Sequence, residues 1–322
     1  MPANYAHYRF GIQALEQFSP DLKRPIQRFR RLYDVGLHGP DLFFYYNPLM
    51  QNSLAALARR THALSGREFF TQACEILKKN PSEAGQAYLY GLLCHYCLDS
   101  ALHPLVLAES AAGDFGHVEL EVEFDRFLLE KDGKTPPCTQ NFSRHMKLTR
   151  GECVTAALFF PSASPAAIHR CVKTMAFGTR VLAGKDRRLL KAVLSLAPAA
   201  VAQNLILPHA NHKCFHLDEA LLERYEQAFR RFPAMVDQLA AHLDYHAPLG
   251  EEFDPSFDGS PKPEIIVAGR RQQPPPFLYF FRFQGTARSS PPMHTAMTAR
   301  PGSSLSPVLG LLASPSAPAS GV

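Results

Sequence analysis

The stretch LLCHYCLDSALHPLV, residues 92–106, places three residues of metal-binding type at four-residue intervals in an otherwise apolar run. His95, Asp99 and His103 are one helical turn apart, so their side chains emerge on one stripe of a predicted buried helix. Each buried polar group left without a partner would cost about 1–3 kcal/mol. The stretch therefore predicts a metal site inside a helical core, or else a set of buried hydrogen bonds and ion pairs.

A second pair of the same kind follows along the chain. His117 and Glu121 stand four apart in GHVELEVEFDRF, after the short connection VLAESAAGDF. A connection of this length lets the next helix fold back on the first, so that five candidate ligands can meet. Imidazole and carboxylate ligands without thiolate are typical of catalytic zinc sites. Cys94 and Cys97 form a C-x-x-C inside the helix without a second pair, and we interpret them as small core side chains.

The wider hydrophobic pattern predicts an all-α fold, because apolar residues recur at helical spacing and alternating strand-like runs are almost absent. A capping box of Ser65 and Glu68 starts a helix near 65–79, and Pro165 after Ser164 starts one near 164–183. A long helix over about 82–103 is expected to end before Pro104, since proline disfavours the helical conformation of the preceding residue. Further helices are expected near 4–17, 20–33, 49–63, 117–130, 150–160, 186–197 and 217–246.

Composition divides the 322-residue chain in two. We interpret residues 1–258 as one helical domain and 259–322 as a Pro/Ser-rich, low-complexity tail that is expected to be disordered. The island FLYFFRF, residues 277–283, is either a partner- or membrane-touching segment or has no role. The chain begins MPANYAHYRF without an apolar leader, has seven scattered cysteines and has no run of 18 or more apolar residues, which favours a cytoplasmic protein.

The net charge of +5 is too mild to indicate nucleic acid as a partner. Five basic residues gather in KRPIQRFRR, residues 23–31, which faces either an anionic surface of lipid or RNA or plain solvent. Two further groups of histidines are interpreted as a polar loop and as surface residues, with metal binding near Asp218 as the alternative for the first. They are His209, His212 and His216, and His242 with His246.

HYCLDSALHP, followed by H-x-x-x-E fourteen residues after His103, resembles the zinc-dependent phospholipase C family, which is distantly related to the S1/P1-type nucleases. The segments MPANYAHYRFG, GLHGPDLFFY and RRTHAL resemble early blocks of that family, so the likeness covers roughly residues 1–130. The resemblance implies a multi-helix bundle of that type and two or three Zn²⁺ ions.

By that resemblance, one zinc ion is held by Asp41, His62, His95 and Asp99, and a second by His103, His117 and Glu121. His7 would belong to a third ion that shares Asp99. Pro2, once Met1 is removed, would supply the amine and carbonyl that complete this third site. Asp41 is also the candidate for orienting the attacking water. On the residues alone, His7, Asp41 and His62 are equally a surface histidine, a turn aspartate and a helix-end histidine.

Residues around the ligands have less specific roles. Asp125 continues the His117–Glu121 stripe and is expected to fix an imidazole tautomer from outside the ligand set, with a simple salt bridge as the alternative. Glu123 points elsewhere on the helix and is expected to be solvated. The aromatic run Phe43–Tyr46 follows Asp41 and either walls a substrate pocket or packs in the core.

Together these features predict a zinc-dependent phosphodiesterase that hydrolyses a phospholipid or related phosphodiester through a multi-zinc site and metal-activated water. Transient contact with a membrane surface is expected, and a stable nucleic-acid partner is not. Two alternatives stay open. One is an S1/P1-like nuclease, and the other is a helical zinc-binding module without catalytic activity.

Overall fold

The computed structural model describes residues 4–48, 50–113, 115–183, 206 and 209–260. Within these residues every regular element is a helix, and the one β-type contact is an isolated bridge between Ser65 and Ser256. The predicted all-α class is confirmed. The helix predicted near 186–197 and almost all of the tail from 259 lie outside the described residues, so that helix, the domain boundary and the disorder stay predictions.

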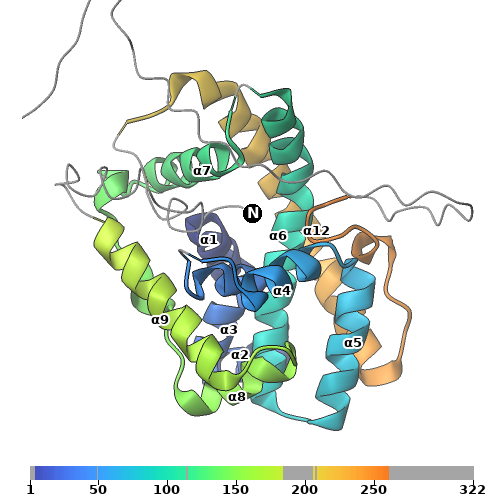
Figure 1. Cartoon of the computed structure of the whole chain (residues 1–322). Helices are drawn as coiled ribbons and strands as arrows, with labels where there is room; N and C mark the ends of the chain where they lie inside the picture. Colours follow the sequence, from blue (N-terminus) through green and yellow to red (C-terminus); the bar gives the residue numbers. More distant parts are fainter. Residues whose placement is uncertain (1–3, 49, 114, 184–205, 207–208, 261–322) are drawn as a thin grey trace, which may run out of the picture. The chain divides into compact units, whose positions relative to one another are not determined.

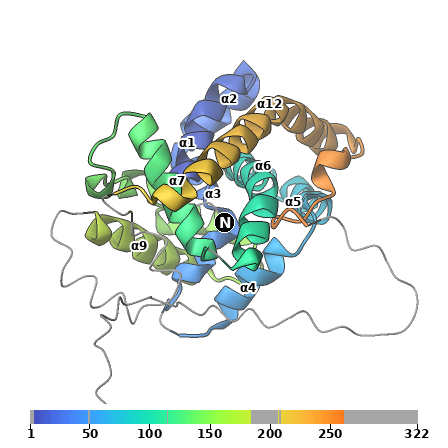
Figure 2. The same ribbon diagram turned by 90° about the horizontal axis from the view of Figure 1, so that it is seen from above.

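The long helix α6, Glu83–Ala112, lies at the centre of the bundle (Figures 1 and 2). Every residue from Ala87 to Ser100 is buried, as expected of a helix that is apolar all round. Among the described helices, α6 alone is long and apolar enough to cross a membrane, yet 72% of that window is buried inside the protein. Core packing therefore accounts for its apolar composition.

The crossing of α6 with α3, Arg30–Gly36, sets up the functional region. A Cβ added to Gly91 of α6 would lie 2.4 Å from the Tyr33 carbonyl oxygen, and one added to Gly36 would lie 3.0 Å from the Gly91 Cα. Two glycines thus let the helix backbones touch. This contact brings the segment after α3 directly over the middle of α6.

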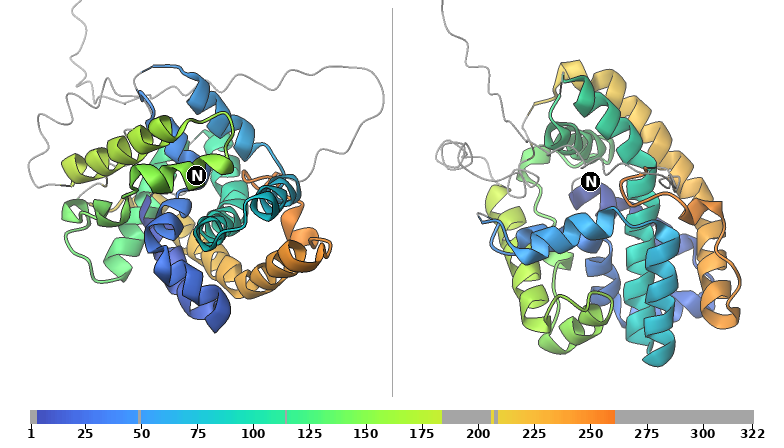
Figure 3. Two further views of the ribbon diagram at one scale, coloured as in Figure 1. Left: turned by 90° about the horizontal axis from the view of Figure 1, so that it is seen from below. Right: turned by 45° about the vertical axis from the view of Figure 1, so that its right-hand side comes forward.

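The other helices surround α6. Helices α1 (Asn4–Ala14), α2 (Pro20–Arg28), α5 (Gly66–Lys79) and α12 (Phe215–Tyr245) pack along it, and α7 (His117–Lys131) folds back against its end as predicted. Figure 3 shows α5 running beside α6. The pair α8 (Arg150–Leu158) and α9 (Pro165–Leu182) lies to one side. The 3₁₀ helix η2 (Gly39–Tyr45) contacts both α9 and α6, and α4 (Ser53–His62) packs against η2.

Local sequence signals placed several helix ends correctly. The capping box of Ser65 and Glu68 is formed, and α9 begins at Pro165 behind its cap Ser164. The helix predicted over 20–33 is instead interrupted at Phe29, which separates α2 from α3. Short 3₁₀ turns make up the remaining elements: η1 (Leu15–Gln17), η3 (Pro137–Thr139), η4 (Ser143–His145), η5 (His212–Cys214) and η6 (Glu251–Phe253).

The predicted end of the long helix before Pro104 is wrong, because α6 continues through this proline to Ala112. Proline has no N–H to offer the Ser100 carbonyl four residues back. Arg231 of α12 compensates next to this gap, since its Nη2 donates to the Cys97 carbonyl oxygen and to Ser100 Oγ, both at 2.8 Å. Gly259 packs against the Pro104 ring on the same side. Tertiary contacts thus outweigh the tendency of Pro104 to end the helix.

Candidate metal centre

Five elements meet around the middle of α6, and each supplies side chains of metal-binding type. Helix α1 supplies His7, η2 supplies Asp41 and α4 supplies His62 at its end. Helix α6 adds its stripe of three residues, and α7 adds two from its first turns. Seven of the eight predicted ligands are buried, and the side chain of His117 is 13% exposed. The eight are His7, Asp41, His62, His95, Asp99, His103, His117 and Glu121.

We call the first group the Asp99 cluster: Asp41, His62, His95 and Asp99. Their ligand atoms all lie within 4.8 Å of one another. His62 Nε2 lies 2.9 Å from Asp41 Oδ1 and 3.7 Å from Asp99 Oδ2, and His95 Nε2 lies 3.2 Å from the same Asp99 oxygen. Three separate elements therefore point nitrogen and oxygen ligands at one point.

We call the second group the His117 cluster: His103, His117 and Glu121. His117 Nε2 lies 2.7 Å from Glu121 Oε1, and His103 Nε2 lies 3.7 Å from that oxygen. The two clusters adjoin, because His103 Nδ1 lies 3.7 Å from Asp99 Oδ2. His7 joins from the other side, with its Nε2 3.3 Å from Asp99 Oδ1 and its ring stacked on His95. Asp99 is thus the carboxylate shared by the imidazoles of His7, His62, His95 and His103.

Several buried ligand atoms make no hydrogen bond within the described part of the chain. They are Nδ1 and Nε2 of His7, Nε2 of His62 and His95, Oδ1 of Asp41 and both oxygens of Asp99. Leaving such groups unsatisfied costs about 1–3 kcal/mol each, more for charged groups, so ordinary hydrogen bonding does not explain the arrangement. A cation at the centre of the cluster would satisfy these atoms together.

The imidazole rings are oriented for metal binding by backbone carbonyl groups. His62 Nδ1 lies 2.7 Å from the Ala58 carbonyl oxygen, and His95 Nδ1 lies 3.2 Å from the Leu37 carbonyl oxygen. A carbonyl oxygen only accepts, so each Nδ1 carries the hydrogen and each Nε2 directs a lone pair into the cluster. This is the arrangement by which proteins fix metal-binding histidines.

The ligand set fits zinc in chemistry and in spacing. Zinc bound tetrahedrally at about 2.0–2.1 Å sets its ligand atoms about 3.4 Å apart. The separations of 2.9, 3.2 and 3.7 Å within the Asp99 cluster bracket this value, as do those of 2.7 and 3.7 Å in the His117 cluster. Small side-chain shifts suffice to reach the tetrahedral geometry.

The electrostatics also favour a cation. Burial disfavours a charged His62 ring, but the Asp41 carboxylate 2.9 Å away and the negative charges of Asp99 and Asp258 outweigh burial and raise the pKa of His62 to about 9. Burial and the neighbouring His95 ring lower the pKa of His7. Without metal, the carboxylates thus hold a proton on His62, and a bound cation would displace it.

Two residues that the sequence did not single out hold the site in shape. Gly39 has φ +47°, and a Cβ there would lie 2.3 Å from Cδ2 of His95, so only glycine lets η2 pass over this ligand. Phe257 is fully buried with its ring 6.1 Å from that of His62 and 6.0 Å from that of His95. It covers both imidazoles with an apolar face.

The aromatic run after Asp41 divides between the core and the site. Phe43 and Tyr45 are buried in the core, and Asn4 Nδ2 donates to the Tyr45 hydroxyl. The Phe44 ring instead stacks at 6.1 Å from the ring of His62. Phe44 is therefore the member of this run that lies beside the candidate ligands.

Asp125 has a different function from the predicted one. Its two carboxylate oxygens accept hydrogen bonds from the backbone N–H groups of Tyr5, at 2.7 Å, and Ala6, at 2.8 Å. These are donors at the start of α1, which have no partner inside the helix. Asp125 thus anchors α1 and places His7 beside Asp99, while backbone carbonyls orient the rings of His62 and His95.

The prediction that Glu123 is solvated is wrong. Glu123 is 3% exposed and accepts hydrogen bonds from Arg126 Nε at 2.7 Å and from the Asn211 backbone N–H at 3.0 Å. The segment before α12 covers this face of α7, which a single-helix pattern does not reveal. Pro2 lies outside the described residues, so its ligand role stays a prediction.

The other histidine groups do not form a metal site within the described residues. His209, His212 and His216 are exposed, whereas Asp218, the acidic residue expected to join them, is buried. His246 is exposed beside Lys78 Nζ, and His242 Nδ1 lies 2.7 Å from the Ala247 carbonyl oxygen. All seven cysteines are free and buried, so Cys94 and Cys97 act as core side chains.

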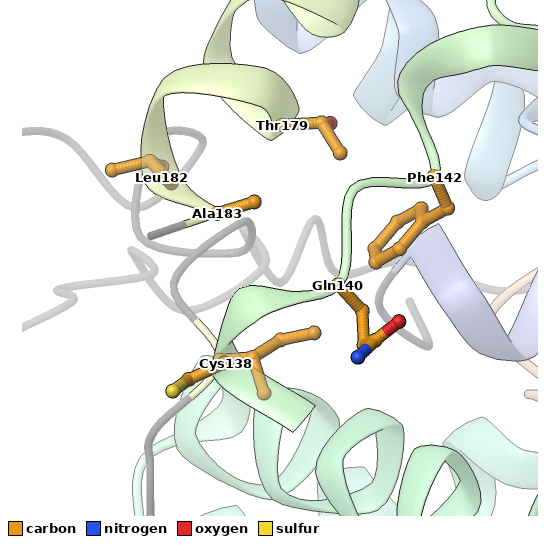
Figure 4. A pocket seen from close by; sticks show the side chains of 7 residues that line it. Cys138, Gln140, Phe142, Thr179, Leu182 and Ala183 are labelled. Atoms are coloured by element: carbon orange, nitrogen blue, oxygen red, sulfur yellow. The ribbon is translucent and has the colours of Figure 1, made fainter. Parts of the chain in front are cut away.

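A hollow at the C-terminal end of α9 is separate from this chemistry. Its lining shares no residue with either cluster and contains no imidazole or carboxylate (Figure 4): Cys138, Gln140, Phe142, Thr179, Leu182, Ala183 and Ile206. The hollow therefore offers no group of ligands like those of the Asp99 and His117 clusters.

Comparison with protein families agrees with the geometry. The model of the family described as zinc-dependent phospholipase C matches residues 6–177, more than half of the 322-residue chain. This range contains the seven residues of the two clusters and also His7. Searches of curated proteins and of solved structures found no match.

Proposed function

Because the chain belongs to the zinc-dependent phospholipase C family, we propose that it hydrolyses a phospholipid or a closely related phosphodiester at the two adjoining clusters. One observation carries the proposal. Seven nitrogen and oxygen ligands without thiolate converge in the interior, and within the described residues the facing atoms of Asp41, His62, His95 and Asp99 form no hydrogen bond. A buried set of this kind suits catalytic zinc rather than a structural site.

We propose one zinc ion for each cluster. The Asp99 cluster offers four ligands, enough to complete a tetrahedron, whereas the His117 cluster offers three and leaves one position for water or substrate. The contact of His7 with Asp99 supports a third ion, for which Pro2 would have to supply the remaining ligands.

Bound zinc would offset phosphate charge and make ionised water available near neutral pH. The protein contributes the positions of the reacting groups. His117 is the one partly exposed ligand, so the substrate phosphate is expected to approach on its side. Asp41 holds a carboxylate oxygen 2.9 Å from His62 and is our candidate for orienting the attacking water.

A panel of three substrates tests this function against its alternatives. Zinc-loaded protein and chelator-treated protein would be assayed on a chromogenic phosphodiester, a monomeric short-chain phosphatidylcholine and single-stranded DNA. Zinc-dependent release of phosphocholine is the expected result. Cleavage of DNA alone would establish the nuclease alternative. Zinc binding without turnover of any substrate would establish the silent module.

A further inference from the structure

The outward face of α9 carries an unusual combination of side chains. Arg170, Lys173, Phe177, Arg180 and Val181 are all exposed and lie three or four residues apart, within about 100° of the helix circumference. Phe177 is 57% exposed and Val181 is 45% exposed. Helix α9 contains no Asp or Glu. We call these five residues the α9 face.

The cations of the α9 face have no carboxylate partner among the described residues. Within the described ranges, no ion pair joins Arg170, Lys173 or Arg180 to a carboxylate. The guanidinium of Arg170 instead lies 5.3 Å above the Tyr46 ring, and that of Arg180 lies 5.7 Å from the Phe177 ring. Their positive charge is therefore available to an external anion.

The basic stretch 23–31 provides an instructive contrast. Each of its five cations lies 2.6–3.6 Å from a carboxylate oxygen: Lys23 with Glu16, Arg24 with Asp21, Arg28 with Glu83, Arg30 with Asp34 and Arg31 with Glu152. This stretch looked in the sequence like the candidate for an anionic surface. Because its cations are paired with carboxylates, residues 23–31 are better interpreted as a solvated helix face.

The α9 face is also connected to the candidate metal centre. Helix α9 packs against η2, which carries Asp41, and lies along the side of the bundle in Figure 1. Arg170 contacts Tyr46 in the loop that links η2 to α4. Met50 in the same loop is 71% exposed. Arg170 of the α9 face thus contacts the connection between two ligand-bearing elements, and that connection also carries an exposed apolar side chain.

We propose that the α9 face docks the protein onto an anionic lipid bilayer. The three cations would lie among the headgroups, while Phe177 and Val181 would enter the boundary with the acyl chains, as in interfacial amphipathic helices. Valine cannot stack on a base, so the mixed face suits lipid better than nucleic acid. The biological role rests on the proposed function, but the binding itself is measurable without turnover.

The test is co-sedimentation of the full-length, zinc-loaded protein with phosphatidylcholine vesicles that contain or lack phosphatidylserine. The triple variant Arg170→Ala, Lys173→Ala, Arg180→Ala is compared with the matched control Lys23→Ala, Arg24→Ala, Arg28→Ala, which also removes three positive charges. Each cation near an anionic surface changes partitioning roughly fivefold, so the α9 variant is expected to bind about 100-fold more weakly. The control should change by less than about fivefold.

Two further measurements separate the contributions. Phe177→Ser is expected to weaken binding about tenfold at any salt concentration, because it removes apolar area. Raising salt from about 0.1 M to 1 M should weaken the wild type and leave the α9 triple variant nearly unchanged. Circular dichroism and zinc content should be unaltered in all variants, since none of the replaced residues is buried and none is a candidate ligand.

Several outcomes would overturn the docking proposal. These are an absence of binding to anionic vesicles, equal weakening by the α9 variant and its control, and binding of RNA but not vesicles through these residues. Hydrolysis of monomeric short-chain phosphatidylcholine reports on the proposed function separately. A wild type that fails in that assay but binds vesicles through the α9 face would refute the function and support the docking.

Discussion

The Asp99 and His117 clusters share similar ligands but differ in enclosure. All four residues of the Asp99 cluster are buried, and they come from three elements. The His117 cluster has three ligands from two helices, and His117 is partly exposed. Under the proposed function, the enclosed Asp99 cluster would retain an ion, whereas the more open His117 cluster would present one to the substrate.

Replacing Asp99 with Asn should have the largest effect, because this carboxylate contacts imidazoles of both clusters. Changes outside a metal's ligand set typically cost 10–100-fold in affinity or activity, so loss of this shared ligand should cost more than about 100-fold. Zinc content by elemental analysis should fall at both clusters, together with phosphodiester hydrolysis. Asp237→Asn, at an exposed position on α12, is the control. Full zinc retention in Asp99→Asn would refute the shared role.

Gly39→Ala should damage the Asp99 cluster without altering any ligand. The new Cβ would lie 2.3 Å from the His95 ring, and the positive φ adds about 1–2 kcal/mol of strain. We expect about 100-fold weaker zinc binding at this cluster by chelator competition. Gly133→Ala is the matched control, because φ is +70° there and nothing lies within 4 Å. Equal losses in both variants would indicate strain rather than displacement of His95.

His117→Ala should remove one ion only. The Asp99 cluster keeps all four of its ligands, so zinc content should fall by one ion per protein while hydrolysis is lost. His246→Ala, at an exposed histidine, is the control. Loss of all zinc from His117→Ala would show that the two clusters fill together, contrary to the division drawn above.

Zinc affinity of the Asp99 cluster should depend on pH. In the folded, metal-free protein the pKa of His62 is raised from 6.5 to about 9. Protonation of this ring therefore stabilises the folded, metal-free protein fully below pH 6.5, and this stabilisation is lost as the pH rises through 9. Zinc must displace this proton. Affinity should therefore rise about tenfold per pH unit between pH 6.5 and 9 and then level off. Chelator competition with the His117→Ala variant measures the zinc affinity of the Asp99 cluster at each pH. An affinity that does not change with pH would contradict the proton displacement.

Asp125→Asn should have the smallest effect on the metal site. It weakens the hydrogen bonds to the backbone N–H groups of Tyr5 and Ala6, at a cost of about 1–3 kcal/mol in the free energy of unfolding. Thermal denaturation should show a lower Tm, with both clusters still able to bind zinc. If zinc binding were lost at both clusters instead, Asp125 would have the direct supporting role expected from the sequence.

The sequence predicted the features that depend on local spacing. The stripe His95–Asp99–His103 and the pair His117–Glu121 follow helical periodicity, and the caps of α5 and α9 are local signals as well. The likeness to a known family, rather than spacing, added Asp41 and His62. The structure brings these groups from distant segments to one place.

The features that the sequence did not predict depend on contacts between distant segments. Helix α6 continues past Pro104 because of Arg231, which donates to a carbonyl 134 positions earlier. Glu123 is buried because Asn211 and the segment around it cover α7. Asp125 binds the start of α1, 120 positions away. Such partners leave no mark on the periodicity of a single helix.

The most direct test of the central claim is a crystal structure of zinc-loaded protein with anomalous scattering recorded at the zinc absorption edge. We expect one peak at the Asp99 cluster, bounded by His62 Nε2, His95 Nε2 and the carboxylates of Asp41 and Asp99. We expect a second peak at the His117 cluster, between His103, His117 and Glu121. Each peak should lie about 2.0–2.2 Å from its ligand atoms. Peaks confined to surface histidines such as His212 and His216, with both clusters empty, would contradict it.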